Sequence, residues 1–122
     1  MKLVSGVDLI EIDRIDQVLD QHGQHYLDRV FTAEEIALSG RRVESLAGRF
    51  AAKEAVAKAL GCGIGEVAWK EIEILENEAG APVLRLNGEA ALKADALGVE
   101  TWSVSISHSQ SHAMALAVAV GP

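Results

Sequence analysis

Apolar and polar positions along the chain follow two periods, and each period predicts one type of secondary structure. Alternating or continuous apolar stretches predict strands over residues 2–10, 69–76, 83–86, 101–107 and 113–120. Helical apolar spacing, capping residues and alanine-rich sequence predict helices over residues 13–22, 32–39, 43–60 and 87–97. This order of elements predicts an α+β fold with a mostly antiparallel sheet.

Residues with known capping preferences mark several of the helix ends. Asp13 is a plausible N-cap of the first helix. Thr32 and Glu35 have the spacing of a capping box, in which each side chain accepts a hydrogen bond from the other residue's backbone. Gly61 follows the helix over residues 43–60, in the place of a C-terminal cap. We therefore expect that helix to be the best defined element of the chain.

Two of the predicted strands carry information beyond their position. Residues 69–76 alternate strictly, which places Ile72 and Ile74 on one face, and the turn after them predicts a hairpin with residues 83–86. The strand over residues 113–120 is apolar nearly throughout, so both of its faces should be covered. It is therefore expected either at the centre of the sheet or against a second copy of the chain.

The composition is that of one ordinary globular domain. The chain has 122 residues, of which 49% are hydrophobic and 24% are charged, and we expect a single domain over residues 1–122. No stretch approaches the roughly 20 apolar residues of a membrane span, and the first residues lack the pattern of a signal peptide. Cys62 is the only cysteine, which excludes a disulfide scaffold. These features predict a cytoplasmic protein with no membrane partner.

The charge is acidic overall and unevenly distributed. The formal net charge is −7, which disfavours nucleic acid as a partner. Residues 41–58 nevertheless hold five basic residues and two acidic ones. A basic segment within an acidic chain suggests a local site for an anion such as phosphate.

The helix over residues 43–60 carries the first candidate chemistry. Arg49 and Lys53 lie four residues apart, as do Glu54 and Lys58, so each pair shares a helix face. One interpretation is a surface ion pair between Glu54 and Lys58, worth about 0.2–0.5 kcal/mol. The other is an anion site, because the cations outnumber the acids and a glycine-rich turn follows, whose backbone N–H groups could approach a phosphate.

Asp8 is an acid inside a hydrophobic strand, where aspartate is depleted. A buried carboxylate is costly unless it is paired or bound to a metal. One interpretation is an exposed edge position or a helix cap. The other joins Asp8 with Glu54 as ligands of a hard divalent cation, since Mg²⁺ commonly takes only one or two protein carboxylates.

His108 ends a strand in which serines alternate with apolar residues, and strand ends are where ligands are often met. The alternative is an exposed histidine in a turn. The sequence contains no zinc-binding spacing, nucleophile elbow or Walker loop. Nothing in the sequence supports Cys62 as a nucleophile.

Three segments together resemble the small bacterial holo-[acyl-carrier-protein] synthases, a branch of the 4′-phosphopantetheinyl transferases. They are GVDLIEIDRI at residues 6–15, GRFAAKEA with KALG over residues 48–61, and SISHS at residues 105–109. The order, spacing and length match, and the resemblance covers the whole chain. It implies the family fold, in which a long helix packs against a mostly antiparallel sheet.

The resemblance also implies a reaction. A serine hydroxyl of an apo acyl carrier protein attacks the β-phosphorus of coenzyme A in the presence of Mg²⁺. Phosphopantetheine is transferred, and adenosine 3′,5′-bisphosphate leaves. Such a transfer depends mainly on positioning and charge stabilisation. The sequence leaves open whether Glu54 or a metal-bound water accepts the proton of the hydroxyl.

Site residues follow from the same resemblance. It implies Asp8 and Glu54 as metal ligands and, with Lys58 near the diphosphate, as the catalytic residues. The residues implied around the coenzyme A phosphates and adenine are Arg49, Lys53, Lys58, Gly61, Pro82 and His108. Arg14 matches a position that meets the carrier protein. The family further implies a homotrimer with active sites between subunits, which suits a chain too small to surround coenzyme A.

Two features depart from the family pattern. Ala81 stands before the turn proline where the family often has a basic residue. The acidic chain must also dock an acidic carrier, so a local basic patch is needed, for which the candidates are Arg14, Arg29, Arg41 and Arg42.

Two other functions use the same residues. A Mg²⁺-dependent hydrolase of nucleotide diphosphates would use water as its nucleophile and would release phosphopantetheine from coenzyme A without a carrier. A non-catalytic coenzyme A-binding assembly module would not need the full set of Asp8, Glu54 and Lys58.

Overall fold

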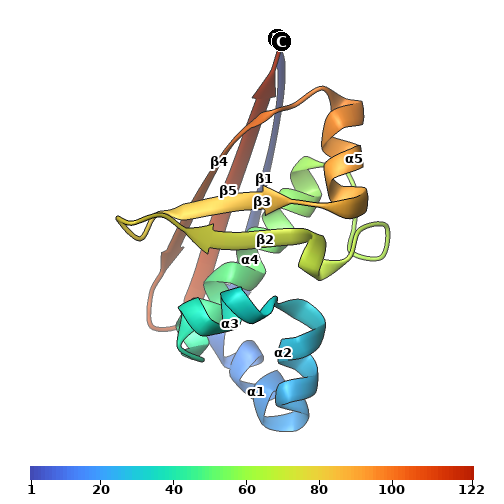
Figure 1. Ribbon diagram of the computed structural model, residues 1–122. Helices are drawn as coiled ribbons and strands as arrows, with labels where there is room; N and C mark the ends of the chain where they lie inside the picture. Colours follow the sequence, from blue (N-terminus) through green and yellow to red (C-terminus); the bar gives the residue numbers. More distant parts are fainter.

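The computed structural model describes the whole chain, residues 1–122, and contains an antiparallel sheet that is covered on one face. The strands β1 (Lys2–Glu11), β5 (His112–Gly121) and β4 (Thr101–His108) are hydrogen-bonded in that order. Figure 1 shows these long strands side by side, with both chain ends at the same end of the sheet. β5 is therefore the central strand, as one interpretation of its apolar sequence predicts.

The helix α4 (Val43–Ala59) packs across the inner face of this sheet. Small side chains keep the contact close, since Ala55 of α4 and Ala115 and Ala117 of β5 are almost fully buried. At Gly6 of β1 the two backbones come nearest, because a Cβ there would overlap the carbonyl oxygen of Ala55. The close approach holds the middle of β1 beside the second half of α4.

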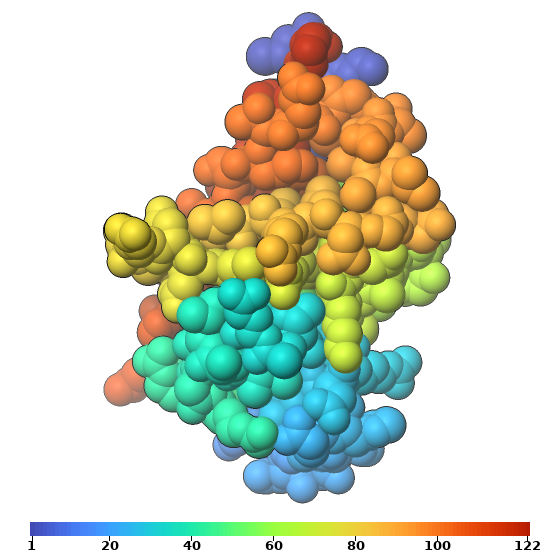
Figure 2. All heavy atoms as spheres, viewed as in Figure 1, coloured from blue at the N-terminus to red at the C-terminus, as the bar shows by residue number.

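A two-stranded hairpin lies against the opposite side of α4. It consists of β2 (Ile72–Glu76) and β3 (Pro82–Leu86), and it leads into the helix α5 (Gly88–Leu97). Buried side chains of Ile72 and Ile74 join the same core as α4. Figure 1 shows the hairpin crossing over α4, and Figure 2 shows its yellow turn projecting from the side of the molecule.

Three short helices form the other end of the molecule, below the hairpin in Figure 1. They are α1 (Ile12–His22), α2 (Gln24–Val30) and α3 (Ala33–Ser39), and they enclose a second apolar cluster that includes Ile15 and Phe31. None of the helices has the length and apolar content needed to cross a bilayer.

The α+β class and the antiparallel pairing are confirmed, together with two of the predicted helix ends. The capping box forms: the amide of Glu35 donates to Thr32 Oγ1 and the amide of Thr32 donates to Glu35 Oε1. Gly61 follows the end of α4 with a φ of 74°, the left-handed conformation that glycine adopts most easily.

Two local predictions are wrong, and one helix was missed. Asp13 does not cap α1: the N-cap is Glu11, and its side chain makes no capping hydrogen bond. Residues 24–30 form a helix that was not predicted. Trp69–Glu71 is a short 3₁₀ helix, η1, so the strand begins only at Ile72. Alternation of apolar and polar residues over only a few positions does not distinguish a strand from a short 3₁₀ helix. Contacts with distant parts of the chain decide between the two.

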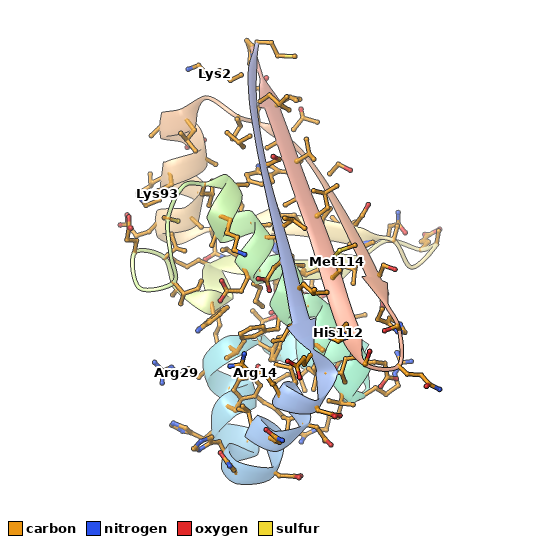
Figure 3. All side chains as sticks on the ribbon, turned by 180° about the vertical axis from the view of Figure 1, so that it is seen from behind. Lys2, Arg14, Arg29, Lys93, His112 and Met114 are labelled. Atoms are coloured by element: carbon orange, nitrogen blue, oxygen red, sulfur yellow. The ribbon has the colours of Figure 1, made fainter.

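The outer face of the sheet is apolar and uncovered. The side chains of β5 alternate between buried alanines and exposed residues such as Met114 and Leu116, and Leu9 of β1 is 63% exposed. The register places Leu9 opposite Met114 and Val7 opposite Leu116. Figure 3 shows β1 and β5 in front, with no element over them. Within a single chain, β5 is thus covered on one face only.

Candidate active site

One hollow lies where β1, α1, α2 and α4 meet, and we refer to it as the α1 hollow. Its volume is about 390 Å³, and its lining residues are Asp8, Leu9, Ile10, Arg14, Ile15, Val18, Tyr26, Phe50 and Glu54. Asp8 points inward because it occupies the same face of β1 as Gly6 and Ile10, which face α4. The close packing of β1 on α4 therefore brings Asp8 and Glu54, which are distant in sequence, to one site.

Asp8, Glu54 and Lys58 form a compact charged group at this hollow. Lys58 Nζ donates to Asp8 Oδ1 at 3.1 Å and to the carbonyl oxygen of Val7 at 3.0 Å. Its side chain is 53% exposed, so the ammonium remains open to a further partner. Lys58 is paired with Asp8, and the surface ion pair between Glu54 and Lys58 is absent.

The electrostatics of Glu54 favour an added cation. Desolvation raises the pKa of Glu54, the negative charge of Asp8 raises it further, and Lys58 partly opposes both effects. A divalent cation between the two carboxylates would relieve this cost. Two carboxylates are a hard oxygen donor set, the kind that Mg²⁺ prefers, so these residues fit the expected metal.

A second hollow lies between α4 and the β2–β3 hairpin, and we refer to it as the hairpin hollow. Its volume is about 230 Å³, and its lining residues are Arg42, Glu44, Ser45, Gly48, Arg49, Ile74, Leu75, Glu76, Gly80, Pro82, Ile106 and His108. Three of the residues expected around coenzyme A, namely Arg49, Pro82 and His108, therefore lie together although they come from three different elements.

Arg49 is the central cation of the hairpin hollow. Its Nε donates to the carbonyl oxygen of Ile74 at 3.1 Å and its Nη1 to Ser45 Oγ at 2.6 Å. Burial lowers the pKa of Arg49, and the negative charge of Glu76 opposes that effect. An anion bound beside Arg49 would offset the same burial cost, which suits a phosphate.

The two hollows lie on opposite sides of α4. Ser45 and Arg49 face the hairpin hollow, whereas Phe50 and Glu54 face the α1 hollow, about half a helical turn away. The strands β1 and β4 are the two edge strands of the sheet. Residues of β4 line the hairpin hollow, and residues of β1 line the α1 hollow. No single hollow of one chain therefore contains all of the expected site residues.

The remaining expected residues divide into three cases. Arg14 lines the α1 hollow, and Figure 3 shows it on α1. Gly61 lies just past α4 and lines neither hollow. Lys53 is the exception that requires a correction. Its side chain is 0% exposed, and its Nζ is bonded to Glu35 Oε1 at 2.8 Å.

The expectation that Lys53 contacts the phosphates of coenzyme A is therefore abandoned. Besides Glu35, its ammonium donates to the carbonyl oxygens of Trp69 and Ile72. These three bonds use all the donors of a lysine. The spacing of four between Arg49 and Lys53 suggested a shared site, but the chain buries one of these side chains more deeply than the other.

Sequence reasoning missed two polar residues whose side-chain oxygens are buried. Tyr26 lines the α1 hollow, and its hydroxyl is buried without a hydrogen-bond partner. Glu73 of β2 is almost fully buried and is paired with Arg85. The spacing of Tyr26, Leu27 and Val30 is helical and could have indicated α2. Nothing in the local sequence marks Glu73 as buried.

Comparison with protein families gives a match over residues 5–117 to a family described as the 4′-phosphopantetheinyl transferase superfamily. The holo-[acyl-carrier-protein] synthase of Herpetosiphon aurantiacus is 50% identical, over 98% of this chain and 99% of the relative. That of Alkaliphilus oremlandii is 45% identical, over 94% of this chain and 96% of the relative.

Solved structures give the same result. The crystal structure of Helicobacter pylori holo-[acyl-carrier-protein] synthase in complex with coenzyme A is 34% identical, with a TM-score of 0.87, over 95% of this chain and 99% of the other. A Bacillus anthracis holo-(acyl-carrier-protein) synthase in complex with CoA (3′,5′-ADP) is 32% identical, with a TM-score of 0.81 and 100% coverage of both chains. These matches extend over nearly the whole chain.

Proposed function

The chain belongs to the 4′-phosphopantetheinyl transferase superfamily, and from this premise we propose how its two hollows perform the transfer of phosphopantetheine from coenzyme A to a serine of an acyl carrier protein. The observation that carries the proposal is the meeting of Asp8 and Glu54 in one hollow, with Lys58 Nζ 3.1 Å from Asp8. Two acids and an exposed cation suit a reaction centred on a diphosphate.

Asp8 and Glu54 are the proposed ligands of Mg²⁺. The donor set supports this assignment, as does the raised pKa of Glu54, which reflects desolvation and the neighbouring charge of Asp8. When bound, the metal would supply positive charge to neutralise the diphosphate. The two carboxylates would otherwise repel the phosphate oxygens.

Lys58 is the proposed stabiliser of charge on the diphosphate. Its bonds to Asp8 and to the Val7 carbonyl oxygen hold the ammonium at the mouth of the hollow, while half of the side chain stays exposed. A positioned cation of this kind favours the transition state over the ground state as charge develops on the leaving phosphate. Glu54 is the proposed acceptor of the serine proton, because its carboxylate lines the same hollow as Asp8.

The hairpin hollow is the proposed site for the nucleotide end of coenzyme A. Arg49 and His108 offer positive or hydrogen-bonding groups, and Pro82 supplies an apolar wall. Two structural neighbours were solved with coenzyme A or its nucleotide portion, which supports the assignment. Gly61 keeps its proposed role near the phosphates through the backbone of the turn that follows Lys58.

We further propose a homotrimer with active sites between subunits. Asp8, Glu54 and Lys58 lie on one side of α4, and Arg49 and His108 lie on the other. One coenzyme A molecule touches both groups only if a second copy places its hairpin hollow beside the first copy's α1 hollow. The exposed apolar face of the sheet supplies a surface for such an assembly.

The carrier protein is the proposed partner at α1. Arg14 lines the α1 hollow, so a carrier bound through Arg14 would have its serine close to Asp8 and Glu54. An acidic partner suits a basic residue at that place, although the chain as a whole is acidic. The expected cytoplasmic location stays a prediction.

The test is to mix the protein with an apo acyl carrier protein, coenzyme A and Mg²⁺, and to weigh the carrier by mass spectrometry. We expect the carrier to gain one phosphopantetheine, and to gain none when its acceptor serine is replaced by alanine. Release of phosphopantetheine from coenzyme A without any carrier would instead indicate a hydrolase.

A further inference from the structure

The strand β2 has one edge that no other strand covers. The hairpin sheet contains only β2 and β3, and a two-stranded hairpin is only marginally stable alone. Side chains take the place of a third strand. Lys53 Nζ donates to the carbonyl oxygen of Ile72 at 2.6 Å, and Arg49 Nε donates to that of Ile74 at 3.1 Å. The amide of Ile74 donates to Glu35 Oε2 at 2.9 Å.

Lys53 and Glu35 form the buried centre of this arrangement. Both side chains are 0% exposed, and their charged atoms are 2.8 Å apart. Glu35 also accepts a hydrogen bond from the amide of Thr32, and Lys53 also donates to the carbonyl oxygen of Trp69. All of their polar atoms are therefore satisfied. A buried ion pair contributes little net stability compared with an apolar pair, so net stability alone does not explain why this one is present.

The geometry that the pair selects is that of the hairpin hollow. One wall of this hollow comes from the hairpin, through residues 74–76, Gly80 and Pro82, and the opposite wall comes from Arg49 and its neighbours on α4. The backbone atoms that Lys53 and Glu35 hold belong to Ile72 and Ile74, at the start of the hairpin wall. Loss of either side chain would remove one of the hydrogen bonds that hold this edge of β2 against α3 and α4, and would leave the bond from Arg49 to Ile74.

We propose that Lys53 and Glu35 are a positioning pair that sets the width of the hairpin hollow, and thereby the affinity of the enzyme for the nucleotide end of coenzyme A. This inference rests on the proposed function, in which that hollow holds the nucleotide. It gives Lys53 a role through β2 instead of the direct phosphate contact expected from its place in the motif.

The pair is separated from the proposed metal ligands although Lys53 and Glu54 are neighbours in sequence. Consecutive residues of a helix point about 100° apart. Lys53 is buried between α4 and the hairpin, whereas Glu54 opens into the α1 hollow. Removal of Lys53 should therefore change nucleotide binding without changing the response to Mg²⁺.

The test uses the variants Lys53→Met and Glu35→Gln, which keep the volume of each side chain. We expect the KM for coenzyme A to rise about tenfold, which corresponds to about 1.4 kcal/mol, while kcat changes by less than about threefold. The Mg²⁺ concentration for half-maximal rate should stay unchanged. Hydrogen–deuterium exchange should become faster over residues 72–86. The matched control is Lys93→Met, which breaks the partly exposed Lys93–Glu66 pair outside both hollows and should change none of these quantities.

Two results would overturn the proposal. One is an unchanged KM for coenzyme A with unchanged exchange over the hairpin. The other is an equal change in KM, kcat and the Mg²⁺ response, which would mean that the pair serves general stability. If Lys53→Met does not fold, Glu35→Gln decides, and failure of both to fold also indicates a role in general stability. If the wild-type protein itself transfers nothing, the proposed function fails, and exchange over the hairpin still tests the positioning role.

Discussion

Asp8 and Glu54 place two negative charges in the same hollow, which favours the binding of a cation there. The pKa of Glu54 is raised because its side chain is partly desolvated and lies near the negative charge of Asp8. Lys58 compensates only in part, since it bonds to Asp8 and to a backbone carbonyl oxygen. The chain therefore keeps a locally unfavourable arrangement of charge, as active sites often do.

The substitution Asp8→Asn tests the metal assignment. It removes one of the two negative charges while keeping the volume of the side chain, so we expect kcat/KM to fall by at least about a hundredfold. The melting temperature should stay close to that of the wild type. Transfer rates at a series of Mg²⁺ concentrations provide the measurement. Asp95→Asn, on the exposed surface of α5, is the control and should retain full activity. Near-wild-type turnover by Asp8→Asn would refute the assignment.

The substitution Lys58→Ala separates transition-state stabilisation from substrate binding. If the ammonium acts mainly on the charge that develops at the diphosphate, kcat should fall by about 10²–10³ and KM for coenzyme A should rise much less. Steady-state kinetics with coenzyme A as the varied substrate measure both constants. A larger change in KM than in kcat would show that Lys58 only binds the substrate.

Tyr26 gives a pH dependence with a defined sign. Burial raises the pKa of its hydroxyl above the ordinary value of 10.0, so the unfolded chain ionises first as the pH rises. The contribution of Tyr26 to stability is therefore complete below pH 10 and is lost above it. Since Tyr26 is the only tyrosine, its absorbance change on ionisation can be followed directly. The stability of Tyr26→Phe should therefore decrease less at alkaline pH than that of the wild type. An unshifted titration of Tyr26 would contradict the burial.

At the scale of elements, the site depends on how closely β1 packs on α4. Gly6 lies against the backbone of Ala55, one residue after Glu54. This contact decides whether the carboxylates of Asp8 and Glu54 meet, because Asp8 lies two residues after Gly6 on the same face of β1. A glycine and a stretch of alanines thus matter as much to the site as its charged residues do.

The substitution Gly6→Ala tests this packing. Its Cβ would overlap the carbonyl oxygen of Ala55, which a backbone shift must relieve, so we expect a loss of about 1–3 kcal/mol in the free energy of unfolding. Transfer activity should fall as well, because the shift separates Asp8 from Glu54. Gly63→Ala is the control, since nothing lies within 4 Å of its Cβ, and it should change stability by less than about 0.5 kcal/mol. Urea denaturation measures both variants. Equal stability for the two would show that β1 and α4 are not tightly packed.

Elements with a local signal could be predicted from the sequence, and those that depend on distant contacts could not. The capping box at Thr32 and the helix α4 follow from residues within one or two helical turns. The helix α2 begins at Gln24, and its N-cap, Gly23, has no side chain to make a capping hydrogen bond, so no local residue marked its start. The 3₁₀ helix η1 has the alternation of a strand, and its place is set partly by Lys53, whose Nζ bonds to the carbonyl oxygen of Trp69.

The candidate site divides in the same way. Asp8 and Glu54 could be joined from the sequence because Asp8 is an acid inside a hydrophobic strand and Glu54 is an acid within a basic segment. The family resemblance added Lys58 to them. Lys53 was assigned to the wrong partner, because its true partner, Glu35, lies 18 residues away in another helix. A lysine in an alanine-rich helix looks the same in the sequence whether it faces a phosphate or a buried carboxylate.

At the scale of the whole molecule, the two hollows on opposite sides of α4 and the uncovered sheet face point to the same assembly. A chain of 13.0 kDa has too small an interior to enclose coenzyme A alone. Exposed apolar side chains on β1 and β5 form a continuous patch, because the register pairs Val7 with Leu116 and Leu9 with Met114. Such a patch is typical of a surface that is covered by another chain.

The substitution Leu116→Glu places a charge in the middle of this patch. We expect the wild-type protein to sediment with three times the mass of the 13.0 kDa chain, and Leu116→Glu to sediment as a folded monomer, because a buried unpaired charge opposes association. Transfer activity should fall by at least about a hundredfold, since a monomer cannot bring Arg49 and Glu54 to the same coenzyme A. Leu92→Glu, at an exposed position on α5, is the control and should leave the mass and the activity unchanged. A fully active monomer would show that each chain completes its own site, so that coenzyme A does not bridge the two hollows.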